Sequence, residues 1–303
     1  MLDLGKLIAL REVSLQGSMT GAAQSLQITV SAVSQQISKL ENELEIPLLE
    51  PLGRGVQLTS AAHELIQAAE TALASLEEVE AELRSRGAAI RTLRIAAFHS
   101  FTLYRLLPLL AILDDVAPHI RIETIELDPA DAIIEVSSRR ADIAIIDEYP
   151  GIPITPTQGL VKSHICFDPI HIYVPQGTEI QADEDIAQVG GRMSWTMESK
   201  RTDSFFWSRS VCRELGFEPE VAFESPDFQL HAALVHAGKS AAFLPESILS
   251  ALPYELTAAP GFPTDLRREL SVVIRRGTQH RTDIETTIDA ITQVYAGLGA
   301  NQS

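Results

Sequence analysis

The chain has 303 residues, 45% of them hydrophobic, and 41 acidic against 24 basic residues give a formal net charge of −17. This length fits two or three domains, and the acidity argues against non-specific binding to nucleic acids. No apolar run approaches the roughly 20 residues that a transmembrane helix needs. The N-terminus also lacks the pattern of an export signal. We therefore expect a cytoplasmic protein that does not contact the membrane.

Residues 17–60 predict two short helices joined by a tight turn. Ser18 and Thr29 are polar residues that can cap the two helices. Apolar side chains recur along the second helix with helical spacing, at Val33, Ile37, Leu40 and Leu44. Its other face carries the hydrogen-bonding side chains Ser31, Ser34, Gln35, Gln36 and Lys39. Such a face suits the major groove of DNA, although a solvated amphipathic helix has the same periodicity.

A glycine-bearing hairpin is predicted directly after these helices. Residues 47–50 and 56–59 are the two short strands, and Gly53 and Gly55 allow a sharp reversal that leaves Arg54 at the tip. A helix-turn-helix followed by such a hairpin is a winged DNA-binding unit.

The order and spacing of three sequence blocks, at 17–23, 31–41 and 53–59, resemble the LysR-type transcriptional regulators. We expect Ser34 and Gln35 to read base edges, Thr20, Thr29 and Lys39 to hold phosphates, and Arg54 to enter the minor groove. Ser31 opens the same helix and is included in the expected DNA-binding set. Two positions that often carry arginine in this family hold Gln35 and Pro51.

The predicted DNA-binding domain, residues 1–59, is itself acidic. Its basic residues are Lys6, Arg11, Lys39 and Arg54, and they are outnumbered by acidic ones. Because affinity for DNA normally depends on phosphate neutralisation, one such domain should bind weakly. Several copies acting together would be needed.

Residues 60–88 predict a long helix that supplies those copies. From Ser60 to Arg86 the chain has no proline or glycine. Apolar residues recur at heptad spacing, at Leu65, Ala69, Ala72, Leu76, Val79 and Leu83. Packing within one chain would give the same pattern, but directly behind a winged helix we favour a dimerisation seam.

Strand-like and helix-like segments alternate after Gly87. We predict strands at 93–97, 120–126, 141–146, 171–174, 194–196, 221–223, 240–243 and 270–274. Helices are predicted at 106–113, 128–140, 204–215, 228–237 and 282–298. This alternation implies mostly parallel sheets covered by helices. The whole chain is thus an α+β multidomain protein.

The resemblance implies that residues 91–303 form an effector-binding domain like the periplasmic binding proteins, with a ligand cleft between two α/β lobes. The first lobe would comprise about 91–161 and 268–303, and the second about 162–267, with chain crossings near Val161 and Arg267. Ligands in open α/β sheets bind at the carboxyl ends of strands and at helix N-termini. The expected effector-binding residues are therefore Ser100, Thr102, Thr196 and Gln229, although each could instead be an ordinary helix cap.

Asp128, Asp147 and Glu148 also follow strand-like segments. If they line the cleft they favour a cationic or amine-bearing effector, whereas ordinary surface acidity is the alternative. His99 lies beside the expected pocket and could hydrogen-bond a ligand. Cys166 and Cys212 have no metal-site or Cys-x-x-Cys spacing, so we expect buried thiols rather than a redox sensor.

The sequence contains no dinucleotide-binding, phosphate-loop or nucleophile-elbow motif. We expect no enzymatic activity, no cofactor and no metal. The expected function is a sequence-specific, DNA-binding transcriptional regulator that a small molecule controls. Its partners would be promoter DNA, the effector and further copies of itself as a homodimer or homotetramer, with RNA polymerase as another candidate. The alternatives are a two-lobed solute-binding protein and a ligand-independent DNA-binding protein.

Overall fold

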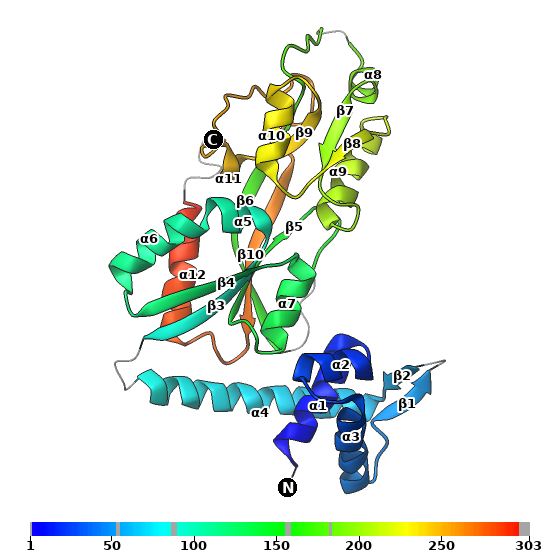
Figure 1. Cartoon of the computed structure of the whole chain (residues 1–303), viewed down its shortest axis with the longest axis vertical. Helices are drawn as coiled ribbons and strands as arrows, with labels where there is room; N and C mark the ends of the chain where they lie inside the picture. Colours follow the sequence, from blue (N-terminus) through cyan, green and yellow to red (C-terminus); the bar gives the residue numbers. More distant parts are fainter. Residues whose placement is uncertain (1, 53–54, 86–89, 155–158, 182–183, 297–303) are drawn as a thin grey trace.

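The computed structural model describes residues 2–52, 55–85, 90–154, 159–181 and 184–296. A small helical unit and a long helix precede a two-lobed α/β domain (Figure 1). The N-terminal elements are α1 (Leu4–Gln16), α2 (Met19–Leu26), α3 (Val30–Leu44), β1 (Leu49–Leu52), β2 (Gly55–Leu58) and α4 (Ser60–Ser85). Strands β1 and β2 pair in an antiparallel hairpin. The winged helix-turn-helix predicted from the sequence is confirmed.

Local hydrogen bonds fix the ends of the first helices. The Ser18 hydroxyl accepts from the Gly21 amide at the start of α2, and the Thr29 hydroxyl accepts from the Ala32 amide at the start of α3. Val33, Ile37 and Leu40 are buried in one cluster with residues of α1, α2 and α4. Burying each of these side chains contributes about 1.5–3 kcal/mol, so the apolar stripe orients α3.

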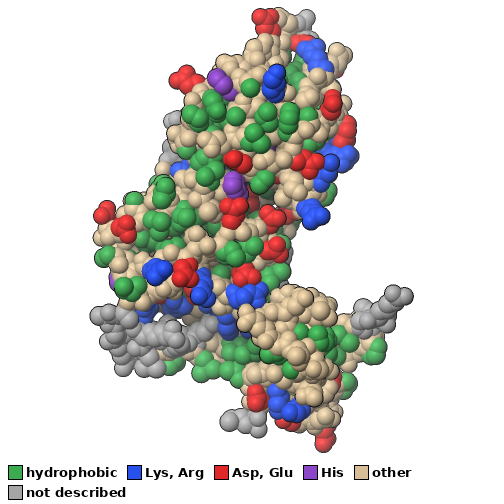
Figure 2. Space-filling model, viewed as in Figure 1, with side chains coloured by type: hydrophobic (Ala, Val, Ile, Leu, Met, Phe, Trp, Pro, Cys, Tyr) green, Lys and Arg blue, Asp and Glu red, His purple; other side chains and the backbone are tan. Residues whose placement is uncertain are grey.

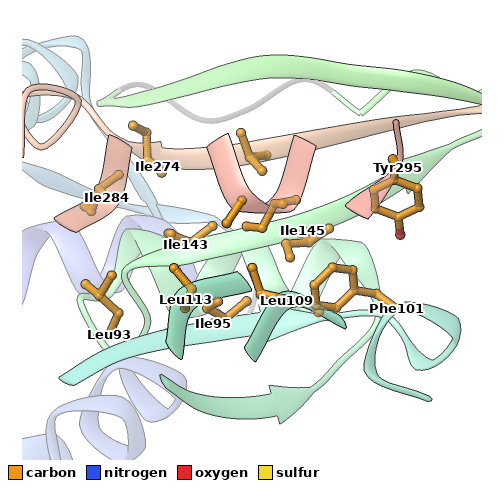
Figure 3. Packing of buried hydrophobic residues seen from close by; sticks show 14 of the residues in the cluster. Leu93, Ile95, Phe101, Leu109, Leu113, Ile143, Ile145, Ile274, Ile284 and Tyr295 are labelled. Carbon is orange, nitrogen blue, oxygen red and sulfur yellow. The ribbon is translucent and has the colours of Figure 1, made fainter. Parts of the chain in front are cut away.

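The first lobe is built on strands that pack against helices on both faces. Its elements are β3 (Arg91–Ala97), α5 (His99–Tyr104), α6 (Leu106–Val116), β4 (Ile120–Glu126), α7 (Pro129–Ser137), β5 (Ile143–Glu148), β10 (Arg267–Arg275) and α12 (Thr282–Val294). In its main core, Leu109 and Leu113 from α6 and Ile284 from α12 pack on Ile95 and Ile143 of the sheet (Figure 3). Helix α7 covers the opposite face.

The second lobe repeats this arrangement. Its elements are the second part of β6 (Leu160–Tyr173), α8 (Ile186–Gly191), β7 (Ser194–Met197), α9 (Asp203–Glu214), β8 (Glu220–Glu224), α10 (Phe228–His236), β9 (Ala241–Pro245) and α11 (Glu246–Leu249). Trp195 is fully buried at its centre, stacked on Phe217 and in contact with Phe243.

One mixed sheet runs through both lobes in the order β4-β3-β5-β10-β6-β9-β7-β8. The long strand β6 pairs with β10 as far as Pro169 and with β9 from Ile170 onwards. The chain therefore first crosses between lobes near Pro169, later than the expected crossing at Val161, and returns through β10 at Arg267. The full length of β6 was not predicted from the sequence, because proline is normally excluded from strand interiors. Here Pro169 lies where β6 changes partner.

The small helical unit rests against the first lobe (Figure 1). The Arg11 guanidinium donates to the Ser137 carbonyl at the end of α7, and Arg140 Nη1 donates to Ser25 Oγ at 2.6 Å. None of the helices in the described part of the chain is long and apolar enough to cross a bilayer.

Candidate DNA-binding face and effector cavity

Helix α3 presents a continuous polar face. Ser31, Ser34, Gln35 and Lys39 are all exposed, and spacings of three and four residues place them on one side of the helix. Ser38 is a further exposed hydroxyl on this face, beyond the predicted set. The face opposes the buried stripe, which is the arrangement that a recognition helix requires.

Thr20 and Thr29 lie at the amino ends of α2 and α3, and both are exposed. The Thr29 hydroxyl also lies 2.9 Å from the Ser31 hydroxyl. Free backbone amides gather at helix N-termini and attract phosphate, so both positions suit backbone contacts. Arg54 lies outside the described residues.

Two of the basic residues counted in the sequence are engaged within the protein. Lys6 forms an ion pair with Glu43. Arg11 is 2% exposed, and its Nε lies 2.8 Å from a carboxylate oxygen of Glu70. Neither residue is therefore available to neutralise DNA phosphates, which leaves Lys39 as the cation of the α3 face.

The expected seam along α4 divides into two parts. Ala69 is buried and Leu65 is half-buried in the cluster of the DNA-binding unit, so both pack within their own chain. Ala72, Leu76 and Val79 are exposed, with exposed fractions of 57% for Leu76 and 54% for Val79. The side chain of Leu83 lies outside those described.

A cavity of about 410 Å³ opens between the two lobes. This volume is in the range of small-molecule sites. Its lining follows the carboxyl ends of β3, β4, β5 and β7 and includes the first residues of α5, α7, α9 and α10. The rule that ligands bind at strand carboxyl ends therefore located the cavity correctly.

Arg268 of β10 lies in the wall of this cavity. The guanidinium is 2% exposed and contacts Asp168 at 2.9 Å and Asp147 at 3.1 Å. It also donates to Ser100 Oγ at 3.2 Å. Burial alone would lower the pKa of Arg268, but the Asp168 carboxylate and its neighbours raise it well above the usual value. The arginine therefore stays charged and is held by carboxylates.

The expected effector residues are distributed unevenly around this cavity. Ser100 lines it, whereas Thr102, Thr196 and Gln229 do not. The Thr102 hydroxyl is directed to the Phe98 carbonyl at 3.4 Å, and Thr196 is fully buried with its hydroxyl 2.5 Å from Ser240 Oγ. Thr196 lies inside β7 rather than beyond its end. Gln229 is exposed on α10.

Several lining residues were missed in the sequence. Glu198, Thr202 and Ser204 follow β7, and the strand-end rule would have found them if the strand had been extended beyond Thr196. Arg268 lies within β10, which begins at Arg267 rather than at the predicted Leu270.

The three acids that follow strands have different environments. Asp128 and Asp147 line the cavity, and Asp147 is 7% exposed. Glu148 instead forms an ion pair with Lys162 at 2.8 Å. Asp147 is therefore not an ordinary surface acid. Its Oδ2 accepts hydrogen bonds from Arg268 and from the Tyr149 hydroxyl.

Glu198 is the most strongly perturbed carboxyl group in the cavity. Burial, followed by the nearby Asp147 carboxylate, raises the pKa of Glu198 to about 7. His99 also lines the cavity, and its Nδ1 lies 2.9 Å from Glu126.

Neither cysteine has the environment of a reactive thiol. Both are free, and burial raises the pKa of Cys166 to about 11 and that of Cys212 to about 12. A thiol that stays protonated at neutral pH is a poor nucleophile.

Two family models together match almost the whole chain. Residues 4–63 match the bacterial regulatory helix-turn-helix protein, lysR family, and residues 86–296 match the LysR substrate binding domain. The first match lies over the winged unit and the second over both lobes. A solute-binding protein with only the two-lobed domain is thereby excluded.

Individual relatives agree over the full length. The chain is 24% identical to a probable HTH-type transcriptional regulator, LrrA, of Synechococcus elongatus, covering 96% of this chain and 97% of the relative. It is 25% identical to the HTH-type transcriptional regulator BenM of Acinetobacter baylyi, covering 93% and 92%. A full-length OxyR variant from Pseudomonas aeruginosa shares the fold with a TM-score of 0.61 at 19% identity, covering 96% and 95%. The chain belongs to the LysR family and is a DNA-binding transcriptional regulator with an effector-binding domain.

Proposed function

We propose that this regulator reads its operator with the exposed face of α3 and responds to a small molecule held in the cavity between the lobes. The observation that carries the proposal is the orientation of α3. Its apolar stripe is buried while Ser34, Gln35 and Lys39 are exposed together. In this reading Ser34 and Gln35 contact base edges, and Thr20, Thr29 and Lys39 contact phosphates. Arg54 keeps its expected minor-groove role.

We propose further that the chain works as a homodimer or homotetramer. Leu76 and Val79 are large apolar side chains that are exposed to solvent in the single chain, and a second copy of α4 would cover them. A two-fold pair of winged units would bind a two-fold operator. Two linked units would also compensate for the small number of cations on each α3 face.

The effector site is proposed to be the interlobe cavity with Ser100 in its wall, because Ser100 lines the cavity and its Oγ accepts from Arg268 there. Thr102, Thr196 and Gln229 are not carried into this proposal, since their side chains lie outside the lining. A protein that binds DNA without ligand control would leave the cavity without a role. Thermal unfolding in the presence of a metabolite panel distinguishes the two cases.

Footprinting on the promoter regions around the chain's own gene tests the proposal as a whole. We expect two protected half-sites separated by about one or more helical turns of DNA. Protection of a single half-site, or uniform protection of all sequences, would contradict it.

We also propose that the protein is cytoplasmic, needs no cofactor, has no enzymatic activity and acts on transcription through RNA polymerase.

A further inference from the structure

The chemical character of the interlobe cavity indicates which class of effector it accepts, an inference that rests on the proposed effector site. Six carboxylic side chains line the cavity: Glu126, Asp128, Asp131, Asp147, Glu198 and Asp203. The basic side chains in the lining are Arg201 and Arg268. Acidic side chains also gather near the junction of the lobes on the face seen in Figure 2.

The positive charge of Arg268 is already neutralised. Its guanidinium is shared by Asp147 and by Asp168, which is fully buried and lies outside the cavity lining. Arg201 is exposed to solvent, as are Glu126, Asp128, Asp131 and Asp203, so all of these charges are partly screened and the acids still outnumber this arginine. An anionic ligand would therefore meet an excess of carboxylates.

Carboxylates from the two lobes act on one another across the cavity. The pKa of Asp128 in the first lobe is raised by burial and then by neighbouring acids that include Asp147 and Asp203. The pKa of Asp203 in the second lobe is raised by burial and then by Asp147. Raised carboxyl pKa values of this kind are typical of buried acids whose negative charges lie near one another. A ligand with positive groups would relieve the repulsion and draw the lobes together.

Aromatic rings and a buried carboxylate supply an independent indication. Phe98, Tyr149 and Phe228 line the same cavity, and the Arg268 guanidinium already lies 5.1 Å from the Phe98 ring centre and 5.9 Å from that of Phe228. Two of these rings thus already contact one guanidinium group beside the cavity carboxylates, as aromatic faces favour cations. Asp147 is nine-tenths buried, and both of its hydrogen bonds among the described residues use Oδ2. Its Oδ1 is therefore available to a ligand.

A metal ion fits this cavity poorly. Among the residues that the structure describes, no group of three or more histidine, cysteine or acidic side chains is placed to hold one. The cavity acids are spread over two lobes, which suits a ligand whose positive charges are themselves separated.

We propose that the effector is an organic cation with more than one ammonium or guanidinium group, bound between Asp128 and Asp147 of the first lobe and Glu198 and Asp203 of the second. Each end of such a molecule would pair with the acids of one lobe. Its apolar frame would lie against the aromatic rings.

Titration calorimetry on the full chain tests the ligand class, with spermidine, benzoate and magnesium chloride as probes at low ionic strength. We expect spermidine to bind at a single site and benzoate not to bind. Asp128→Asn and Glu198→Gln should each weaken spermidine binding about tenfold, because each removes one charge-assisted contact. Asp128→Asn removes no helix cap, since the Asp128 side chain makes no capping hydrogen bond.

Glu220→Gln is the matched control, since it removes one charge from the exposed surface of the same lobe as Glu198. If the wild type and the three variants bound spermidine equally, the binding would reflect general attraction by net charge, and the proposal would be overturned. Binding of benzoate, or of magnesium with loss in the cavity variants, would overturn it too. Operator footprinting is independent of these outcomes, so the ligand class can fail while the regulatory function stands.

Discussion

Arg140 Nη1 and Ser25 Oγ lie 2.6 Å apart and join the effector domain to the DNA-binding unit. Arg140 follows the carboxyl end of α7, and the adjacent Ser137 carbonyl accepts from the buried guanidinium of Arg11. The opposite end of α7 begins at Pro129, which lines the interlobe cavity. A single short helix therefore contacts both the cavity and the DNA-binding unit of the same chain.

Arg140→Ala should loosen this domain contact. A hydrogen bond from a charged donor contributes about 1.5 kcal/mol, which corresponds to roughly a tenfold change in the equilibrium between docked and released domains. We expect faster amide hydrogen exchange along α2 and at the end of α7. Arg94→Ala is the control, because the Arg94 side chain also forms an ion pair, but with Glu123 of the first lobe rather than with the DNA-binding unit. Unchanged exchange along α2 in the Arg140 variant would show that other contacts hold the domains.

The DNA-binding unit could be predicted from the sequence because its signals are local. The caps at Ser18 and Thr29 and the buried stripe of α3 all depend on residues within a few turns of one another. The seam of α4 was less certain for a physical reason. Heptad spacing indicates which residues share one face of the helix. It does not indicate whether that face packs within the same chain, as at Ala69, or remains exposed, as at Leu76.

The cavity could be predicted only in outline. The strand-end rule placed Ser100 and Asp128 in the cavity wall, yet it selected Thr196 because the predicted strand ended before the end of β7. Arg268 could not be found by any local pattern. Its role depends on Asp168 and Asp147, which are brought to it by the pairing of β10 with β6 and β5.

Gln35→Ala should weaken binding to the operator and relax preference at one base position. A good bidentate contact to a base is worth about 1–3 kcal/mol, so affinity should fall by roughly five- to a hundredfold. Binding by fluorescence anisotropy to operator variants measures both effects. Gln67→Ala removes the same amide from an exposed position on α4 and should change neither. Wild-type affinity and base preference in the Gln35 variant would remove this residue from the reading face.

Arg268→Met should destabilise the effector domain. Removing one partner of a buried ion pair leaves uncompensated charge on Asp168 and costs about 3–5 kcal/mol. Urea unfolding followed by circular dichroism would record the loss. Arg267→Met is a matched control, because this neighbouring arginine is exposed and lies over the Phe167 ring. Equal stability of the two variants would mean that the Arg268 network makes no net contribution.

Leu76→Asp should abolish assembly and, with it, operator binding. A charge in an apolar interface costs several kcal/mol, whereas the same side chain costs little where Leu76 faces water in the separate chain. Analytical ultracentrifugation gives the assembly state, and circular dichroism checks folding. Thr71→Asp introduces the same charge at an exposed position on another side of α4 and should leave assembly intact. A Leu76 variant that still assembles would show that α4 does not form the interface.

Glu198 should make stability depend on pH in a defined direction. Its pKa is raised from 4.5 to about 7 in the folded chain, first by burial and then by Asp147, while contacts from Ser204 and Arg268 only partly oppose this. The folded chain therefore holds a proton that the unfolded chain releases near pH 4.5. Linkage requires that the resulting stabilisation be complete below pH 4.5 and be lost as pH rises to about 7.

Glu198→Gln should remove this dependence, since the amide stays neutral at every pH. Urea unfolding of both proteins from pH 4 to pH 8 should show the variant gaining stability relative to the wild type as pH rises, with the difference levelling above pH 7. His231 acts in the opposite direction, because burial lowers its pKa to about 4 and its contribution is lost as pH falls below 6.5. That contribution is common to both proteins and cancels in the difference. The free energy of unfolding of Glu220→Gln should change with pH as it does in the wild type. If Glu198→Gln also followed the wild type, the Glu198 carboxyl group would have an ordinary pKa.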